Sequence, residues 1–244
     1  MSEALTEPAR RTALKFSLTR HGGLVALAIL LVVNIAITPN FLQLQTLFVN
    51  ISQVATIAIV AMGMTLVIAT GGIDLSVGAV MALSGALAPL IFGSAFGLEY
   101  PVLGLALSIL LPLAVAALCG VFNGTLVATL NVQPIVATLI LFISGRGIAQ
   151  VLTNGNLQTF SNPSFDYLGT GRILGLPFQG WLAAGIAIVL FLLVTRTAFG
   201  RYLLAVGGNA RAARLAGVPV RRVKIGAYMI CSVLAGLAGL IVVA

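Results

Sequence analysis

One acidic residue, Asp74, lies inside a long stretch that is otherwise without charge, residues 54–93. An ionisable side chain inside a membrane is costly and marks a functional site by default. Two interpretations of the surrounding ATGGIDLSVGA are open. Gly71 and Gly72 can end one helix, and Asp74 or Ser76 can then accept hydrogen bonds from the first backbone N–H groups of the next. Alternatively, the break lines a passage for a substrate, as broken helices do in transporters.

The other polar side chains within the apolar segments are mostly neutral. Such groups suit hydrogen bonding to an uncharged polyol better than binding of an ion, although each can equally join one helix to another. Arg146, with Gln150 one turn later, either faces a passage or is satisfied by backbone carbonyls. The predicted substrate pathway comprises Gly71, Gly72, Asp74, Ser76, Asn123, Gln133, Thr138 and Arg146.

Motifs for catalysis are missing from the sequence. There is no G-x-x-x-x-G-K-[ST] stretch for nucleotide phosphates, no H-E-x-x-H, no Cys/His metal spacing and no G-x-S-x-G. Cys119 and Cys231 both lie in apolar runs, where a free cysteine commonly acts as a small buried hydrophobe. We therefore expect a chain that is not an enzyme, with no catalytic residue, no metal and no bound cofactor of its own.

The composition predicts an all-α, polytopic transmembrane helical bundle. Hydrophobic residues make up 60% of the 244 residues and charged residues only 7%, whereas a soluble domain carries roughly 25% charged residues. Glycine is abundant, and the spacing of Gly120 and Gly124 favours close packing between membrane helices.

The formal net charge of +8 is concentrated in the first 20 residues and in residues 196–224. Because Lys and Arg gather in cytoplasmic loops, this charge indicates topology rather than nucleic-acid binding.

Seven apolar segments give the simplest topology. They lie near residues 22–38, 54–70, 76–93, 101–122, 134–152, 181–195 and 225–244. Six crossings separate the two basic regions, so both can face the cytoplasm.

This topology predicts two main regions. Residues 1–21 form a cytoplasmic N-terminal tail and 22–244 a transmembrane domain, with an external loop at 153–180 and a cytoplasmic loop at 196–224. A broken helix or tight turn is expected near 71–76. If that break lies at mid-membrane depth, 54–93 is instead one long broken segment.

The basic cytoplasmic loop contains the signals of a short helix. Asn209 is a good N-cap, residues 210–216 are strong helix formers, and Gly217 stands at the C′ position. Arg211 and Arg214 are three residues apart and share a face. The charges either set topology and meet anionic lipid, or form a rigid cationic helix on which a cytoplasmic partner docks.

Three stretches together resemble a known family. MGMTLVIATGGIDLSVGAVMALSGA (62–86), NVQPIVATLILFISGRGIAQVLTNG (131–155) and GGNARAARLAGVPVRRVKI (207–225) are similar, in order and spacing, to bacterial ABC-type sugar permeases of the ribose/xylose/galactose class. The resemblance covers nearly the whole chain from about Leu24. Within the class, VIATGGIDLSVGAVMA, VATLI, GRG-AQ and FSNPSF are most similar to the galactofuranose permease.

The resemblance implies partners and roles. Such permeases pair, as two copies or with a paralogue, in the lipid bilayer of the bacterial inner membrane. They are driven by separate cytoplasmic ATP-binding subunits, which use the ATP, and a periplasmic sugar-binding protein delivers the substrate. The segment implied to couple to the ATPase contains Gly208, Asn209, Arg211, Ala213, Arg214 and Gly217. The turn at 71–76 is implied to lie near the translocation path.

Three functions remain open on the sequence. The leading one is the membrane-spanning permease subunit of an ATP-binding-cassette importer for a monosaccharide, with a galactofuranose-like sugar as the expected cargo. The second is a secondary sugar transporter in which Asp74 carries a coupling proton or cation. Family members continue past the position of Ala244, so a third expectation is a C-terminally truncated, nonfunctional fragment.

Overall fold

The computed structural model describes residues 9–39, 41–156, 158 and 162–244. The chain divides into two compact units, Met1–Val49 and Asn50–Ala244. The first unit contains α1 (Ala9–Ile37) and the start of α2 (Leu44–Ala69). Helix α1 begins within the predicted tail 1–21, of which residues 1–8 lie outside the described residues. The first apolar segment is therefore the second half of a longer helix.

The second unit is almost entirely helical. After α2 its elements are α3 (Val77–Phe92), α4 (Ala95–Glu99), α5 (Pro101–Ala128), α6 (Pro134–Leu152), α7 (Pro163–Thr170), β1 (Arg172–Ile173), β2 (Leu176–Pro177), α8 (Phe178–Arg196), α9 (Ala198–Leu215) and α10 (Val220–Val243). Each of the seven predicted apolar segments falls on a helix. In the described part of the chain, α2, α5, α6, α8 and α10 are long and apolar enough to cross a membrane, and Gly22–Ile37 and α3 are shorter apolar helices. The predicted all-α membrane bundle is confirmed.

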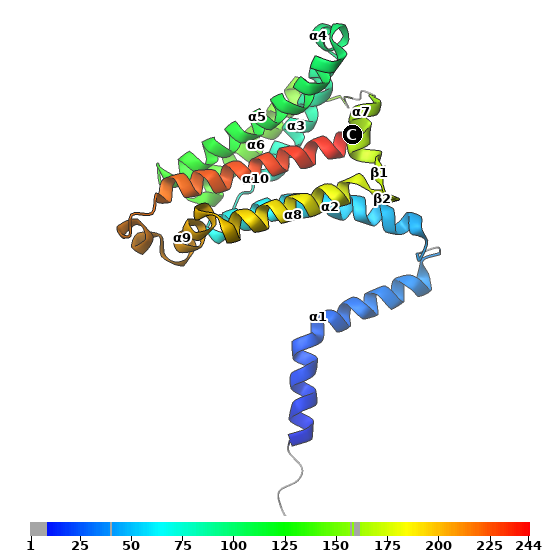
Figure 1. Cartoon of the computed structure of the whole chain (residues 1–244), viewed down its shortest axis with the longest axis vertical. Helices are drawn as coiled ribbons and strands as arrows, with labels where there is room; N and C mark the ends of the chain where they lie inside the picture. Colours follow the sequence, from blue (N-terminus) through cyan, green and yellow to red (C-terminus); the bar gives the residue numbers. More distant parts are fainter. Residues whose placement is uncertain (1–8, 40, 157, 159–161) are drawn as a thin grey trace, which may run out of the picture. The chain divides into compact units, whose positions relative to one another are not determined.

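Helix α10 is the centre of the second unit and packs along α5 and α3 (Figure 1). The predicted close approach at Gly120 and Gly124 of α5 is confirmed. A Cβ atom on Gly120 would lie 2.6 Å from the Cα of Met229, and one on Gly124 would lie 2.7 Å from the Cα of Ile225. Both contacts are to backbone atoms of α10, so the missing side chains let the two helices touch.

Two regions predicted as loops contain more regular structure than expected. In 196–224, α9 begins at Ala198, after the N-cap Thr197, whose hydroxyl accepts from the N–H of Gly200. Helix α10 begins at Val220, directly after Pro219 and before its apolar run. In 153–180, α7 is followed by an antiparallel hairpin that pairs Arg172 with Pro177. The two residues of its turn, Leu174 and Gly175, have φ of 52° and 80°, a type I′ arrangement that leucine rarely signals. Part of this loop, including the start of FSNPSF, lies outside the described residues.

Candidate functional site

The break between α2 and α3 begins with a glycine cap, as predicted. Gly71 has a φ of +77°, which favours glycine. Its N–H donates to the carbonyl of Ile68 at 2.9 Å, and the N–H of Gly72 donates to the carbonyl of Val67 at 3.1 Å. These two bonds form a Schellman motif, which satisfies the carbonyls of Val67 and Ile68 in the last turn of α2.

Asp74 holds the turn that leads into α3. Its Oδ1 accepts hydrogen bonds from the backbone N–H of Ser76 at 2.9 Å and from the Ser76 hydroxyl at 2.6 Å. Ser76, the N-cap residue of α3, makes no side-chain cap bond itself. Of the two predicted acceptors, Asp74 is therefore the one that fixes the start of α3. Both residues are fully buried.

Two neighbouring helices supply hydrogen bonds to the same turn. The Asn123 side-chain amide of α5 donates to the Ser76 hydroxyl at 2.9 Å, which extends the chain of bonds to Asp74. The Thr138 hydroxyl of α6 accepts from the backbone N–H of Leu75 at 3.1 Å. Asn123 and Thr138 are also fully buried. Four of the predicted pathway residues thus form one buried polar cluster.

Tyr228 of α10 completes the cluster, and the sequence analysis missed it. Its hydroxyl donates to the carbonyl of Ile73 at 3.3 Å, and its side chain has no exposed surface. A Cβ atom on Gly72 would lie 2.6 Å from the Tyr228 hydroxyl oxygen, so only glycine leaves room for this ring. A tyrosine within an apolar run resembles an ordinary core residue, and only its position opposite the turn reveals its role.

Three buried polar atoms have no hydrogen-bond partner among the described residues. They are Oδ2 of Asp74, Oδ1 of Asn123 and Oγ of Ser232. Two of these belong to the polar cluster at the helix break. Unsatisfied buried polar atoms are few in native proteins, and each marks an internal water or a functional constraint.

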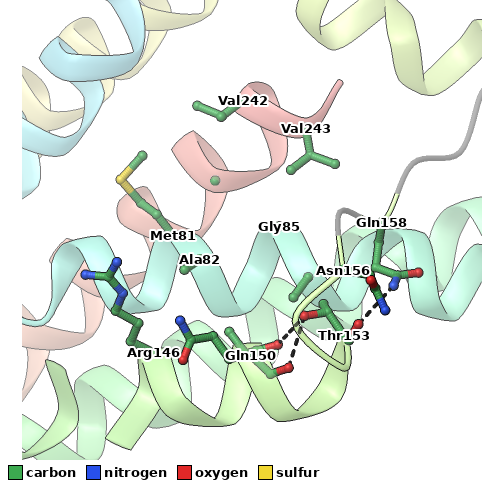
Figure 2. A pocket seen from close by; sticks show the side chains of 13 residues that line it. Met81, Ala82, Gly85, Arg146, Gln150, Thr153, Asn156, Gln158, Val242 and Val243 are labelled. Carbon is green, nitrogen blue, oxygen red and sulfur yellow. Dashed lines mark hydrogen bonds between the residues drawn. The ribbon is translucent and has the colours of Figure 1, made fainter. Parts of the chain in front are cut away.

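Two predicted pathway residues lie outside this cluster. Gln133 is exposed and immediately precedes α6. Arg146 is also exposed and lines a separate cavity of about 340 Å³, bounded by α3, α6, the residues after α6 and the end of α10. Figure 2 shows Arg146, Gln150 and Thr153 following one another along this wall, with the valines of α10 across the space.

The short basic helix has the predicted ends. Asn209 has non-helical φ and ψ of −159° and 99°, and its Oδ1 accepts from the backbone N–H groups of Arg211 and Ala212, both at 3.0 Å. Gly217 has a φ of +82°, and its N–H donates to the carbonyl of Arg214 at 3.1 Å. The N-cap and the C′ glycine are confirmed. The helix is separated by the kink at Asn209 from the first part of α9.

The surface of the segment 210–216 combines charge with one apolar residue. Ala213 is buried in a hydrophobic cluster that also contains Leu66 of α2, so this segment is anchored to the bundle. Arg211 and Arg214 are exposed. Leu215 is 86% exposed, and the sequence analysis did not single it out. An apolar side chain flanked by arginines is typical of a protein contact surface.

Comparison with known proteins shows the family. Residues 46–244 match the family described as branched-chain amino acid transport system / permease component. The match includes the helix break, the cavity and the basic helix.

The chain belongs to this permease family.

The chain is also similar to three characterised permeases. It is 43% identical over 229 residues to the galactofuranose transporter permease of Escherichia coli (strain K12), covering 91% of this chain and 65% of that protein. It is 38% identical over 243 residues to the ribose import permease of the same strain, covering 98% and 74%. With the L-arabinose ABC transporter permease of Azospirillum brasilense it shares 33% identity over 241 residues, covering 97% and 68%. No solved structure matches the chain. The family resemblance stated from the sequence is thereby confirmed.

Proposed function

We propose that this chain is the membrane-spanning permease subunit of an ATP-binding-cassette importer that moves a monosaccharide across the bacterial inner membrane. The observation that carries the proposal is the 43% identity to a galactofuranose permease over 91% of this chain. The similar ribose and arabinose permeases favour a pentose or hexose as the cargo. ATP is hydrolysed by a separate cytoplasmic subunit, a periplasmic sugar-binding protein delivers the sugar, and a second permease copy or paralogue completes the membrane part.

The polar cluster at the helix break is proposed to shape the substrate path. Asp74, Ser76, Asn123 and Thr138 are buried in this chain and bonded to the turn. Their role is therefore to fix the backbone at 70–76, between the end of α2 and the start of α3. A backbone break that is held by side chains from three other helices moves when those helices move, which is the kind of element that alternating access requires.

The segment 208–217 is proposed to be the docking element for the ATP-binding subunit. Its caps make it rigid, Ala213 ties it to the bundle, and Arg211, Arg214 and Leu215 face outward. The N-terminus and the basic region 196–224 then face the cytoplasm, in agreement with the distribution of positive charge.

A charge-reversal experiment tests this docking role. The permease is expressed in its full-length form with its ATP-binding subunit, and the double variant Arg211→Glu/Arg214→Glu is compared with Arg196→Glu/Arg201→Glu. All four arginines are exposed and lie in the same basic region, so the two variants change topology signals equally. We expect only the first to lose co-purification of the ATP-binding subunit and ATP-dependent sugar uptake. Equal loss in both variants would show that the charges act through topology alone.

The rival function, a secondary transporter coupled through Asp74, is tested by energy source. The importer requires ATP and is indifferent to the proton gradient. Uptake in proteoliposomes that contain the complete complex should survive a protonophore while ATP is present. Uptake that persists without ATP and stops with the protonophore would establish the rival.

A further inference from the structure

The cavity beside Arg146 has one polar wall and one apolar wall. Arg146, Gln150 and Thr153 all line it, and their i, i+4, i+7 spacing places them on one face of the helix path. Beside them, α3 contributes small side chains at Ala82, Gly85 and Ala86, and Val242 and Val243 of α10 lie across the space. Figure 2 shows the resulting space between the polar and apolar side chains, with Asn156 beside Thr153.

The polar wall carries hydrogen-bonding groups that none of the described residues uses. The Arg146 guanidinium and the Gln150 amide make no hydrogen bond or ion pair with any described residue. In contrast, the Thr153 hydroxyl donates to the carbonyl of Ala149 at 3.0 Å, and the Asn156 amide donates to the carbonyl of Asn154 at 3.3 Å. An arginine within an apolar helix needs a partner in a pocket or a cavity. The Arg146 donors, which no described residue accepts from, therefore point to a ligand.

Size and chemistry favour a neutral sugar as that ligand. The volume of about 340 Å³ lies at the lower end of the range for small-molecule sites, roughly 300–1,000 Å³. Amide and guanidinium groups donate to hydroxyl oxygens, and the wall of alanine and glycine fits the C–H face of a sugar ring. No acidic residue lines the cavity.

We propose that this cavity is a monosaccharide-binding site in which Arg146 and Gln150 donate hydrogen bonds to sugar hydroxyls. The inference rests on the proposed function and adds a specific place and chemistry to it. The buried cluster at Asp74 shapes the helix break, whereas the cavity at Arg146 contacts the cargo.

Cysteine protection tests the site without relying on transport. The full-length permease, assembled with its partner subunits in lipid, carries Thr153→Cys as the reporter, because cysteine is close to threonine in size and Thr153 lines the cavity. Ser144→Cys is the control, since Ser144 is an exposed residue of α6, the helix that ends just before Thr153, and does not line the cavity. Labelling by a maleimide is quantified at each position by peptide mass spectrometry, with D-ribose, D-galactose or D-ribose 5-phosphate present.

We expect D-ribose or D-galactose to slow labelling at position 153 several-fold and to leave position 144 unchanged. Adding Gln150→Leu or Ala82→Leu should remove the protection, the first by deleting donors and the second by filling the cavity. In uptake assays Gln150→Leu should raise KM about tenfold, the effect of losing roughly one hydrogen bond to a ligand. Ala82→Leu should also raise KM, because its side chain occupies the space of the sugar, while Ser144→Leu should leave KM unchanged.

The outcomes separate the two proposals. Sugar uptake by the wild-type complex without protection at position 153 would overturn the binding site and leave the importer intact. Protection by D-ribose 5-phosphate alone would overturn the neutral-sugar chemistry and assign the Arg146 cavity to an anion. A wild-type complex with neither ATP-dependent uptake nor sugar-stimulated ATPase activity would instead refute the proposed function.

Discussion

Replacing Asp74 separates its role as a hydrogen-bond acceptor from a role that needs its charge. Asp74→Asn keeps the oxygen that accepts from Ser76 and converts Oδ2, which has no partner among the described residues, into an amide nitrogen. Asp74→Ala removes the acceptor altogether. The N–H and the hydroxyl of Ser76 then both lose their partner in a fully buried site.

The expected loss of stability follows from these two hydrogen bonds. A buried donor left unsatisfied costs about 1–3 kcal/mol, and the hydroxyl can rotate toward another acceptor while the N–H cannot. We therefore expect Asp74→Ala to lower the free energy of unfolding by about 2–4 kcal/mol. For a unit of this size that corresponds to a fall in Tm of roughly 5–15 °C. Asp74→Asn should cost less than about 1 kcal/mol because both bonds remain.

The protein carries its own reporters for this measurement. Cys231 is fully buried and Cys119 is half-buried, and both are free thiols. A fluorogenic maleimide that reacts as these thiols become exposed gives an apparent Tm in detergent. All variants are compared at one heating rate, because unfolding of such proteins is commonly irreversible.

Two results would refute the reasoning. If Asp74→Ala melts at the wild-type temperature, the turn is not held by this side chain. If Asp74→Asn is as unstable as Asp74→Ala, the carboxylate charge rather than the acceptor oxygen stabilises the turn. Sugar uptake adds a further distinction, since a stable Asp74→Asn variant that cannot transport would assign the charge to the transport cycle.

Three further predictions concern the contacts around the turn and α10. Tyr228→Phe removes the hydrogen bond to the Ile73 carbonyl. The loss of about 1 kcal/mol or slightly more should lower the apparent Tm by roughly 2–6 °C. An unchanged Tm would mean that another donor replaces the Tyr228 hydroxyl. Gly120→Ala places a Cβ 2.6 Å from the Cα of Met229 and should destabilise the protein by about 1–3 kcal/mol through overpacking. Gly185→Ala is the control, because the space around its Cβ is open. In the same melting assay this control should be neutral or slightly stabilising. Gly207→Ala brings a Cβ onto the Ala69 carbonyl oxygen at the end of α2 and so disturbs the contact between α9 and the helix break. The ATPase activity of the complex should then lose its stimulation by sugar-loaded binding protein. Full stimulation would show that α9 and the helix break are not coupled at this contact.

Local signals in the sequence were sufficient for the ends of the helices. Gly71 and Gly217 both adopt the left-handed conformation predicted for C′ glycines, and Asn209 caps the helix that follows it. Each of these features depends on residues within one helical turn, so the chain itself contains all the information needed. The apolar segments could also be predicted from the sequence, because a membrane helix satisfies its backbone hydrogen bonds within the segment itself.

The partners of the turn depended on tertiary structure. Asn123, Thr138 and Tyr228 bond to residues 47, 63 and 155 positions away in the sequence, and periodicity gives no sign of which helix faces will meet. The same limit explains why Gln133 and Arg146 were grouped with Asp74 and yet lie outside its cluster.

By itself, the sequence determined a membrane bundle of the permease family, the break near 71–76 and the capped basic helix. The bundle, the break and the helix follow from composition and from interactions between near neighbours, whereas the family follows from the resemblance of three stretches to known sugar permeases. Only the tertiary structure decided that Asp74 is sealed inside a polar cluster, that Tyr228 belongs to it, and that Arg146 opens onto a separate cavity. The reason is physical: a side chain's burial and its partners are set by how α3, α5, α6 and α10 pack together, and that packing is a property of the whole chain.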